Sequence, residues 1–361
     1  MRVTAGLPAG VSALLFGAAR ARRALERSLT ERLDAQGWSE VLLPILDYFD
    51  PYRDLVAGAE RELYRFVDRE GELLALRGDF TPMLARLLAP RVRSLELPAR
   101  LYYRGDVVRH RDAGPAGARE QCVVGVELLE AAPELEPPAS DAPRVSAHDE
   151  EILSLLVELL GVAMGFDPLA ANGAEKGLAL VLSWAGVLDE LLENGQGAPD
   201  AELALALSRR ERAAVRGRRE LSEILEEGLP ADPDALGSRG SAAVAALIGL
   251  RDRMTERYPG VALRIDLAEL TAARGSGDRP RPRSAASGLA GGGAKGARGY
   301  YDGVVFQAYS PATALPVASG GRYDTLFREL GAPLAAAGFQ IALDLLLEIA
   351  SARSSGPGVR P

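Results

Sequence analysis

The sequence has very little cysteine and histidine: Cys122, His110 and His148 are the only such residues among 361. A single cysteine excludes a disulfide within the chain and is typical of proteins in a reducing compartment. With so few thiol and imidazole groups, a zinc site is not expected, and we predict no metal and no cofactor. Cys122 falls on the apolar face of a predicted strand, which indicates a buried structural thiol and not a nucleophile.

Long apolar runs and an excess of positive charge are also missing. No stretch approaches the ~20 apolar residues that a membrane span needs, and the N-terminus lacks a signal-peptide pattern. The net charge of −8 argues against a broad nucleic-acid-binding surface, which needs basic groups to displace counterions. The composition, 47% hydrophobic and 25% charged, is that of a globular protein. We therefore expect a cytoplasmic protein that binds neither membranes nor nucleic acid.

The most informative stretch consists of two predicted strands, residues 101–110 and 121–129. The second alternates cleanly, so its odd-numbered residues, including Glu127, share one face. If the strands pair, Arg109 and Glu127 face one cavity. The loop between them, residues 111–120, exceeds the ~2–5 residues usual for a hairpin, and such loops often carry ligand sites. An ordinary solvated loop and a buried ion pair between Arg109 and Glu127 are the alternatives.

The rest of the chain predicts strands, then helices, then strands. Helices are expected at 9–36, 83–90, 149–160, 174–193, 201–207, 210–227, 241–258 and 325–330, strands at 38–46, 62–67, 72–77, 261–267 and 300–310, and a strand running into a helix at 335–350. This order indicates an α+β domain over residues 1–350 with a largely antiparallel sheet flanked by helices. Residues of about 150–260 are interpreted as a helical insertion, 271–299 as a flexible loop, and 351–361 as a flexible tail.

A turn before the helix at 83–90 carries Asp79 and Thr81. Thr81 is predicted to cap the helix, with Pro82 at its first position. Asp79 lies just outside, where a turn or cap role is the simple alternative to a binding role. A second segment, residues 319–324 (SGGRYD), is predicted to be a tight turn leading into a short helix.

Four motifs in this order resemble histidyl-tRNA synthetase, whose catalytic domain has the class II aminoacyl-tRNA synthetase fold. They are LALRGDFTPMLAR, YYDGVVFQAY, SGGRYD and AAGFQIALDLLLEI. The resemblance covers roughly residues 5–350, and the strand at 38–46 is similar to the family's dimer-interface motif. Within the family, Asp79 and the following Phe-Thr are closer to a paralogue, the regulatory subunit of ATP phosphoribosyltransferase.

Departures from the synthetase pattern concern the residues that handle ATP and histidine. Leu345 stands where the resemblance implies an ATP-binding arginine, and Val123 where it implies a histidine-contacting glutamine. Arg111 replaces a glutamate, and Gly296 occupies the place of a further arginine. A leucine cannot replace a guanidinium in stabilising the departure of pyrophosphate. We also expect no anticodon-binding domain, because the sequence stops soon after the last motif.

The resemblance implies a non-catalytic regulatory subunit that activates the short-form ATP phosphoribosyltransferase catalytic subunit in the first step of L-histidine biosynthesis. It implies a dimer of this chain within a hetero-octamer, and it leaves open whether L-histidine binds here. The alternatives are a histidyl-tRNA synthetase-like enzyme or amino-acid adenylating paralogue lacking the anticodon-binding domain, and a synthetase-like interaction module with another partner.

A histidine-like pocket is implied by the same resemblance. Asp79 and Glu127 would hold an α-ammonium group, and Arg109 a carboxylate or phosphate. Tyr301 and Tyr323 would contact an imidazole. Tyr300 and Thr81 would support the pocket wall, although packing of the tyrosines within the sheet is an alternative. No catalytic residue is predicted.

Overall fold

A computed structural model describes residues 6–55, 62–110, 118–132, 143–170, 177–189, 191–192, 200–268 and 301–354. Tyr300, Arg111, Gly296 and the predicted loop at 271–299 lie outside these described residues. None of the described helices combines the length and the apolar character needed to cross a membrane.

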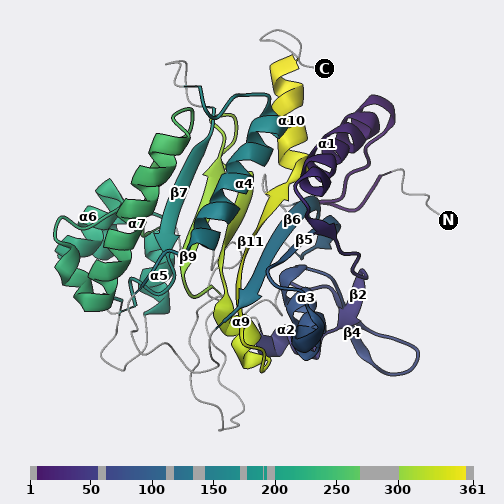
Figure 1. Ribbon diagram of the computed structural model, residues 1–361, viewed down its shortest axis with the longest axis horizontal. Coiled ribbons are helices and arrows are strands. Elements are labelled where there is room, and N and C mark those ends of the chain that lie inside the picture. Colours follow the sequence, from purple (N-terminus) through teal and green to yellow (C-terminus); the bar gives the residue numbers. More distant parts are fainter. Residues whose placement is uncertain are drawn as a thin grey trace.

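An eight-stranded sheet runs through the molecule in the order β1-β5-β6-β11-β10-β9-β7-β8 (Figure 1). The outer pairs β1–β5 and β7–β8 are parallel, and all other neighbours are antiparallel. The bounds are β1 Ser39–Glu40, β5 Ala99–Val108, β6 Glu120–Ala131, β7 Ala179–Trp184, β8 Ala262–Ile265, β9 Val304–Tyr309, β10 Ala318–Arg322 and β11 Leu334–Ala342. The predicted α+β class with a largely antiparallel sheet is confirmed.

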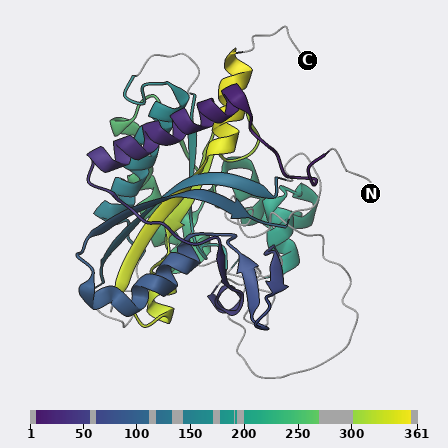
Figure 2. The ribbon, with the colours of Figure 1, turned by 90° about the vertical axis from the view of Figure 1, so that its right-hand side faces the viewer.

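Helices α1 (Phe16–Ala35), α4 (Ala147–Met164) and α10 (Leu343–Ser354) lie on one face of this sheet (Figures 1 and 2). The even-numbered residues of β6 point into the large core beneath them, as the alternation predicts. Helix α4 starts with a capping box, in which Ser146 and Asp149 satisfy each other's backbone N–H groups, and it ends at Gly165 with φ of 67°.

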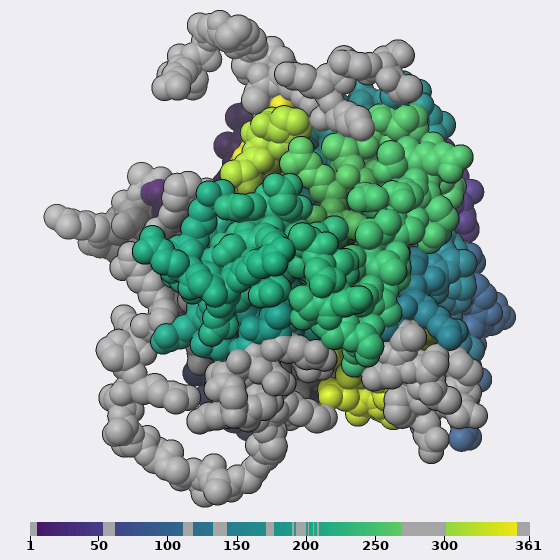
Figure 3. All heavy atoms as spheres, turned by 90° about the vertical axis from the view of Figure 1, so that its left-hand side faces the viewer, coloured from purple at the N-terminus to yellow at the C-terminus, as the bar shows by residue number. Residues whose placement is uncertain are grey.

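The segment from residue 200 to residue 268 covers one side of the molecule (Figure 3). It contains α5 (Ala201–Ser208), α6 (Arg219–Glu227) and α7 (Gly237–Arg257). Their buried side chains belong to the same apolar core as those of α4 and the sheet. These helices therefore pack as part of the main body.

The opposite face of the sheet carries α3 (Thr81–Leu88), α9 (Asp324–Glu329) and a small second sheet (Figure 2). The second sheet has the order β2-β4-β3, with β2 Leu46–Tyr48, β3 Arg65–Val67 and β4 Leu73–Leu76, and α2 (Asp50–Leu55) follows β2. The predicted hairpin at 62–77 is confirmed. Pro44 lies in the irregular segment between β1 and β2, as expected for a proline that interrupts a strand.

Two sequence-based predictions were wrong in extent: the helix predicted at 9–36 begins at Phe16, and residues 351–354 of the predicted tail belong to α10. Three others were wrong in kind. Residues 179–184, assigned to a helix, form β7, because a short apolar run fits a buried strand as well as a helix. The segment SGGRYD is the strand β10 and the start of α9, not a tight turn. Thr81 does not cap α3, because its hydroxyl donates to Glu127 instead.

Candidate functional site

The candidate site lies where β5, β6 and β11 run side by side beneath α3 and α9. Register places Glu127 opposite Leu101 on β5 and opposite Gly338 on β11. A Cβ atom at Gly338 would lie 1.8 Å from Glu127 Oε2, so the carboxylate needs a glycine at this position. The same holds for Gly125, where a Cβ atom would lie 2.2 Å from the ring of Tyr103. Two glycines thus create the space that the polar side chains occupy.

Glu127 is 1% exposed and accepts hydrogen bonds from three hydroxyl groups. Thr81 Oγ1 donates at 2.7 Å, Tyr103 Oη donates at 3.2 Å, and Tyr323 Oη is the third donor. Burial raises the pKa of Glu127 from 4.5 to about 7, although these hydrogen bonds oppose the shift. Near neutral pH this carboxyl group is therefore poised between its charged and neutral forms.

Asp79 provides a second carboxylate beside Glu127. Its Oδ1 accepts from Thr81 N at 3.1 Å and from Gln340 Nε2 at 2.8 Å. Its Oδ2 pairs with Arg109 Nη2 at 3.5 Å, and Arg109 Nε donates to the carbonyl of Gly78 at 2.7 Å. Two carboxylates near one guanidinium leave an excess of negative charge when both are ionised, which favours a cationic ligand group.

Tyr301 and Tyr323 form the wall next to α9. Tyr323 is 2% exposed and reaches Glu127, and burial raises its pKa well above the ordinary value. The ring of Tyr301 lies against β10, where a Cβ atom at Gly321 would meet it at 2.9 Å. Tyr301 also packs against the apolar cluster that contains Tyr323.

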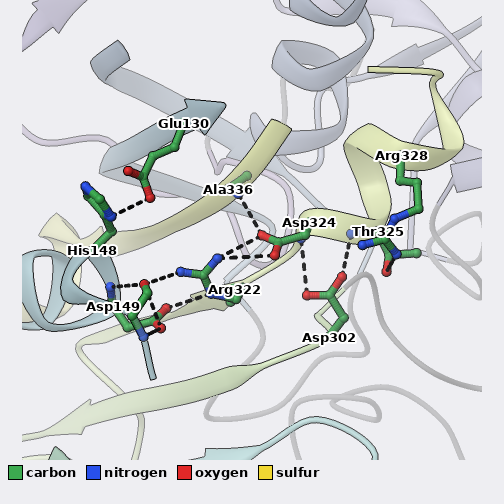
Figure 4. Close-up of polar contacts among 10 residues, drawn as sticks. Glu130, His148, Asp149, Asp302, Arg322, Asp324, Thr325, Arg328 and Ala336 are labelled. Atoms are coloured by element: carbon green, nitrogen blue, oxygen red, sulfur yellow. Dashed lines mark hydrogen bonds and ion pairs between the residues drawn. The ribbon is translucent and has the colours of Figure 1, made fainter. Parts of the chain in front are cut away.

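Arg322, the residue before Tyr323, forms ion pairs with Asp149 and Asp324 (Figure 4). Its Nε donates to Asp149 Oδ1 at 2.9 Å, and its Nη1 donates to Asp324 at 3.2 Å. Asp302, next to Tyr301, accepts from Asp324 N at 3.2 Å and from Thr325 N. Burial and the neighbouring Asp324 carboxylate raise the pKa of Asp302. These contacts join the chain beside each tyrosine to the first turns of α4 and α9.

The structure brings together most of the residues predicted for the site. Asp79, Thr81, Glu127 and Tyr323 form one continuous hydrogen-bonded group, and Arg109 joins it through Asp79. In the described contacts Arg109 pairs with Asp79, whereas Glu127 is held by hydroxyl groups. The alternative of a direct ion pair between Arg109 and Glu127 is therefore not what the structure shows. The role of these residues in binding stays a prediction.

Two members of the group were not predicted, Tyr103 and Gln340. Gln340 Nε2 donates to Tyr103 Oη at 2.9 Å, and the two side chains meet over Gly125. The alternation of β5 already placed Tyr103 on the face of the site. Gln340 follows Gly338 by two residues, so it shares a strand face with the glycine that makes room for Glu127. This shared strand face was the sequence signal from which Gln340 could have been predicted as a site residue.

The two described departures from the synthetase pattern are apolar and packed. Val123 is 2% exposed and lies among Phe80, Tyr103 and Val107. Leu345, on α10, packs against the large core. Neither position offers a polar group to ATP or to histidine.

A separate cleft of about 360 Å³ lies on the helical side, between α1, α4 and the end of α7. Its lining includes Trp38, three glutamates of α4 and Arg257. It contains none of the predicted site residues.

Comparisons with known proteins agree with the fold and with the motifs. The histidyl-tRNA synthetase family model matches residues 10–346. The ATP phosphoribosyltransferase regulatory subunit of Moorella thermoacetica is 32% identical, with 94% of this chain and 81% of the relative covered. That of Symbiobacterium thermophilum is 33% identical, with 98% and 82% covered.

Solved structures show the same fold. A protein of Bacillus halodurans described as an ATP phosphoribosyltransferase regulatory subunit/histidyl-tRNA synthetase has a TM-score of 0.68 at 22% identity, covering 96% of this chain and 83% of that one. A histidine–tRNA ligase subunit of Alicyclobacillus acidocaldarius has a TM-score of 0.67 at 22% identity, covering 98% and 99%. The chain belongs to the histidyl-tRNA synthetase family and, within it, to the ATP phosphoribosyltransferase regulatory subunits.

Proposed function

We propose that this chain is the non-catalytic regulatory subunit that activates a short-form ATP phosphoribosyltransferase catalytic subunit in the first step of L-histidine biosynthesis. The observation that carries the proposal is Leu345, which packs in the core where the synthetase resemblance implies an ATP-binding arginine. An apolar side chain there cannot stabilise the charge that develops as pyrophosphate leaves. The names of the curated relatives support the same role.

The polar group around Glu127 is proposed to bind L-histidine as a regulatory ligand. Asp79 and Glu127 supply negative charge for the α-ammonium group, and Arg109 supplies a guanidinium for the carboxylate. Tyr301 and Tyr323 border the space proposed for the imidazole. Tyr300 belongs to the same proposal, although it lies outside the described residues.

A second copy of this chain is proposed to cover the apolar surface formed by the segment at 42–48 and β3. Leu42, Tyr48 and Val67 are 81%, 54% and 65% exposed, and Tyr48 and Val67 belong to strands of the same small sheet, so this part of the chain exposes several large apolar side chains. This segment overlaps the predicted strand at 38–46, which resembles the family's dimer-interface motif. The dimer would be the unit from which the proposed hetero-octamer with the catalytic subunit is built.

Reconstitution with a short-form catalytic chain tests the proposed function. We expect this chain to copurify with the catalytic subunit and to raise the rate at which ATP and phosphoribosyl pyrophosphate are joined. The isolated chain should show no histidine-dependent exchange between ATP and pyrophosphate. Such exchange would contradict the proposal and establish the adenylating alternative, whereas failure to bind or activate any catalytic chain would favour another partner.

Calorimetry with free L-histidine tests the pocket separately. We expect saturable binding to the intact chain that Glu127→Gln weakens by at least about tenfold, because the amide removes a charge facing the ammonium group. Glu223→Gln, an exposed control on α6, should leave binding unchanged. Absence of binding at millimolar histidine would contradict the sensor role while leaving the activator role intact.

A further inference from the structure

Arg77, at the end of β4, has a buried guanidinium group whose hydrogen bonds go to backbone carbonyls of two separate segments. It is 5% exposed. Nη1 donates to Leu43 O at 2.7 Å and to Pro44 O at 2.8 Å, and Nη2 donates to Asp106 O at 2.8 Å. The backbone N–H of Arg77 also donates to Ile45 O at 2.8 Å. One residue therefore fixes the segment between β1 and β2 to strand β5.

The flat face of the same guanidinium group starts a stack of three side chains. Its central carbon lies 3.8 Å from the centre of the Phe80 ring. Phe80 in turn stacks on Tyr103, with ring centres 4.1 Å apart and an interplanar angle of 9°. Both contacts are of the kinds that stabilise aromatic side chains in defined positions.

Gly105 allows this stack to approach β5 closely. A Cβ atom there would lie 3.1 Å from Arg77 Nη2 and 3.2 Å from the Phe80 ring, and its φ of 149° disfavours other residues. The close approach leaves little freedom for the stack to shift.

The two ends of the stack lie at the two places for which a binding role is proposed above. At one end, the carbonyls that Arg77 holds belong to the segment that exposes Leu42 at 81% and Ile45 at 41%. At the other end, Tyr103 Oη contacts Glu127 and accepts from Gln340. A continuous series of contacts, from Arg77 through Phe80 to Tyr103, therefore joins the 43–45 segment to the pocket.

We propose that Arg77 is a positioning residue that joins the apolar surface at 42–48 to the pocket at Glu127, so that association with a second copy of this chain and ligand binding affect each other. The coupling to a ligand rests on the proposed function, whereas the mechanical connection does not. Because coupling of two binding equilibria is reciprocal, the factor by which dimer formation changes the affinity for L-histidine must equal the factor by which histidine changes the dimerisation constant.

Amide hydrogen exchange on the full chain without ligand tests the connection. Arg77→Met removes both the carbonyl contacts and the stacking face. Arg77→Lys keeps the charge but cannot stack or serve three acceptors in this geometry. Arg100→Met is the matched control on β5, where the half-buried guanidinium pairs with Glu151 at 2.8 Å.

We expect Arg77→Met to accelerate exchange at least about tenfold in two regions together, residues 43–48 and the strands around Glu127 and Gln340. Arg77→Lys should act in the same direction more weakly. Exchange in α7 should stay unchanged in both variants, which separates a local effect from general unfolding, and Arg100→Met should change none of these regions. Acceleration confined to 43–48 would overturn the proposal. If Arg77→Met does not fold, Phe80→Leu interrupts the stack and is judged by the same criterion.

The coupling to a ligand is tested by measuring the dimer dissociation constant with and without L-histidine, using sedimentation velocity across a dilution series. We expect histidine to change the dimer dissociation constant of the wild type about tenfold, and this effect to be absent in Arg77→Lys. A wild-type chain that binds no histidine would contradict the sensor role, while the exchange experiment would still decide the role of Arg77. A histidine effect on the dimer that persists in Arg77→Lys would overturn the coupling.

Discussion

At the residue scale, two glycines determine which side chains can occupy the site. Glu127 lies over Gly338, and the ring of Tyr103 lies over Gly125, in both cases closer than any Cβ atom would permit. Each of these two large polar side chains thus lies over a glycine, which has no side chain, on the neighbouring strand. This pairing explains how the strands β5, β6 and β11 can hold a tyrosine, a carboxylate and a glutamine on one face of the sheet.

Gly125→Ala tests this packing. The added methyl group would lie 2.2 Å from the Tyr103 ring, so the ring must move, and overpacking of this kind costs about 1–3 kcal/mol. Gly17→Ala on α1 is the matched control, because nothing lies within 4 Å of the new Cβ atom. Urea unfolding should show a loss for Gly125→Ala and a gain of up to about 1 kcal/mol for Gly17→Ala. Equal stability of Gly125→Ala and the wild type would contradict the close contact.

Glu127 should also impose a pH dependence on stability. Its folded pKa of about 7 exceeds the ordinary 4.5, so the folded state binds more protons between these values. The free energy of unfolding therefore falls as pH rises from 4.5 to 7, by roughly 3 kcal/mol, and is constant above. Glu127→Gln removes this contribution. The measurement is urea unfolding at several pH values, read as the difference between wild type and variant.

Glu223→Gln is the control, because the Glu223 carboxyl group should contribute a pH dependence of the free energy of unfolding with the opposite sign. The N–H of Ala231 and the Arg219 guanidinium lower the pKa of the exposed Glu223 carboxyl. Its small contribution is present above its unfolded pKa and is lost as pH falls. A difference curve for Glu127→Gln that is flat between pH 4.5 and 7 would show that the carboxyl group is not desolvated.

At the element scale, the sequence predicted the helices and strands whose apolar residues recur with a clear period, and it missed those without such a pattern. The alternation of the predicted strand at 121–129 indicated β6 and the face that carries Glu127, and the helix predicted at 149–160 is α4. β7 (ALVLSW) has no period that separates strand from helix. β10 (ASGGR) has the composition of a turn, yet Gly320 must be a glycine because a Cβ atom would lie 2.2 Å from Gly338 O. Packing against the rest of the molecule determines the secondary structure of both segments, and the sequence of a single segment does not reveal that packing.

The residues of the candidate site, like the helices and strands, were predicted in part from the sequence. The motifs contain Asp79 and Tyr323, and the alternation of the predicted strand at 121–129 put Glu127 on the correct face. The hydroxyl group of Thr81 was predicted to cap the helix. The sequence does not show that this hydroxyl lies next to the buried carboxylate of Glu127 on the sheet. Contacts such as that between Gln340 and Asp79 join residues 261 positions apart, so local patterns could not reveal them.

Arg322 should contribute strongly to stability, because it connects three elements. It is the partner of Asp149, which is 3% exposed, and of Asp324. Arg322→Met would leave the buried Asp149 without its cation, and breaking a buried pair in this way costs about 3–5 kcal/mol. Arg219→Met, which breaks an exposed pair with Glu223, is the control and should change stability little. Thermal unfolding distinguishes the two, and similar losses would contradict a special role for the Arg322 network.

At the scale of the whole molecule, the exposed apolar surface around Leu42 is the feature that a lone chain does not explain. Leu42→Glu places a charge where a second copy is proposed to pack. Sedimentation velocity should show a dimer for the wild type and a monomer for the variant at the same concentration. Leu169→Glu, at a position 61% exposed far along the chain, is the matched control and should remain dimeric. A Leu42→Glu chain that stays dimeric would place the interface elsewhere.

The position of β11 in the sheet has a consequence for the order in which the protein can be made. β11 begins at residue 334, yet it lies between β6 and β10 and is the only described link between the two halves of the sheet. During synthesis, β1, β5 and β6 emerge early and must wait for more than 200 further residues before this strand arrives to pair with the open edge of β6. Exposed strand edges of this kind invite aggregation. Chains terminated before residue 334 should therefore accumulate as insoluble material, whereas those that retain β11 and α10 should fold.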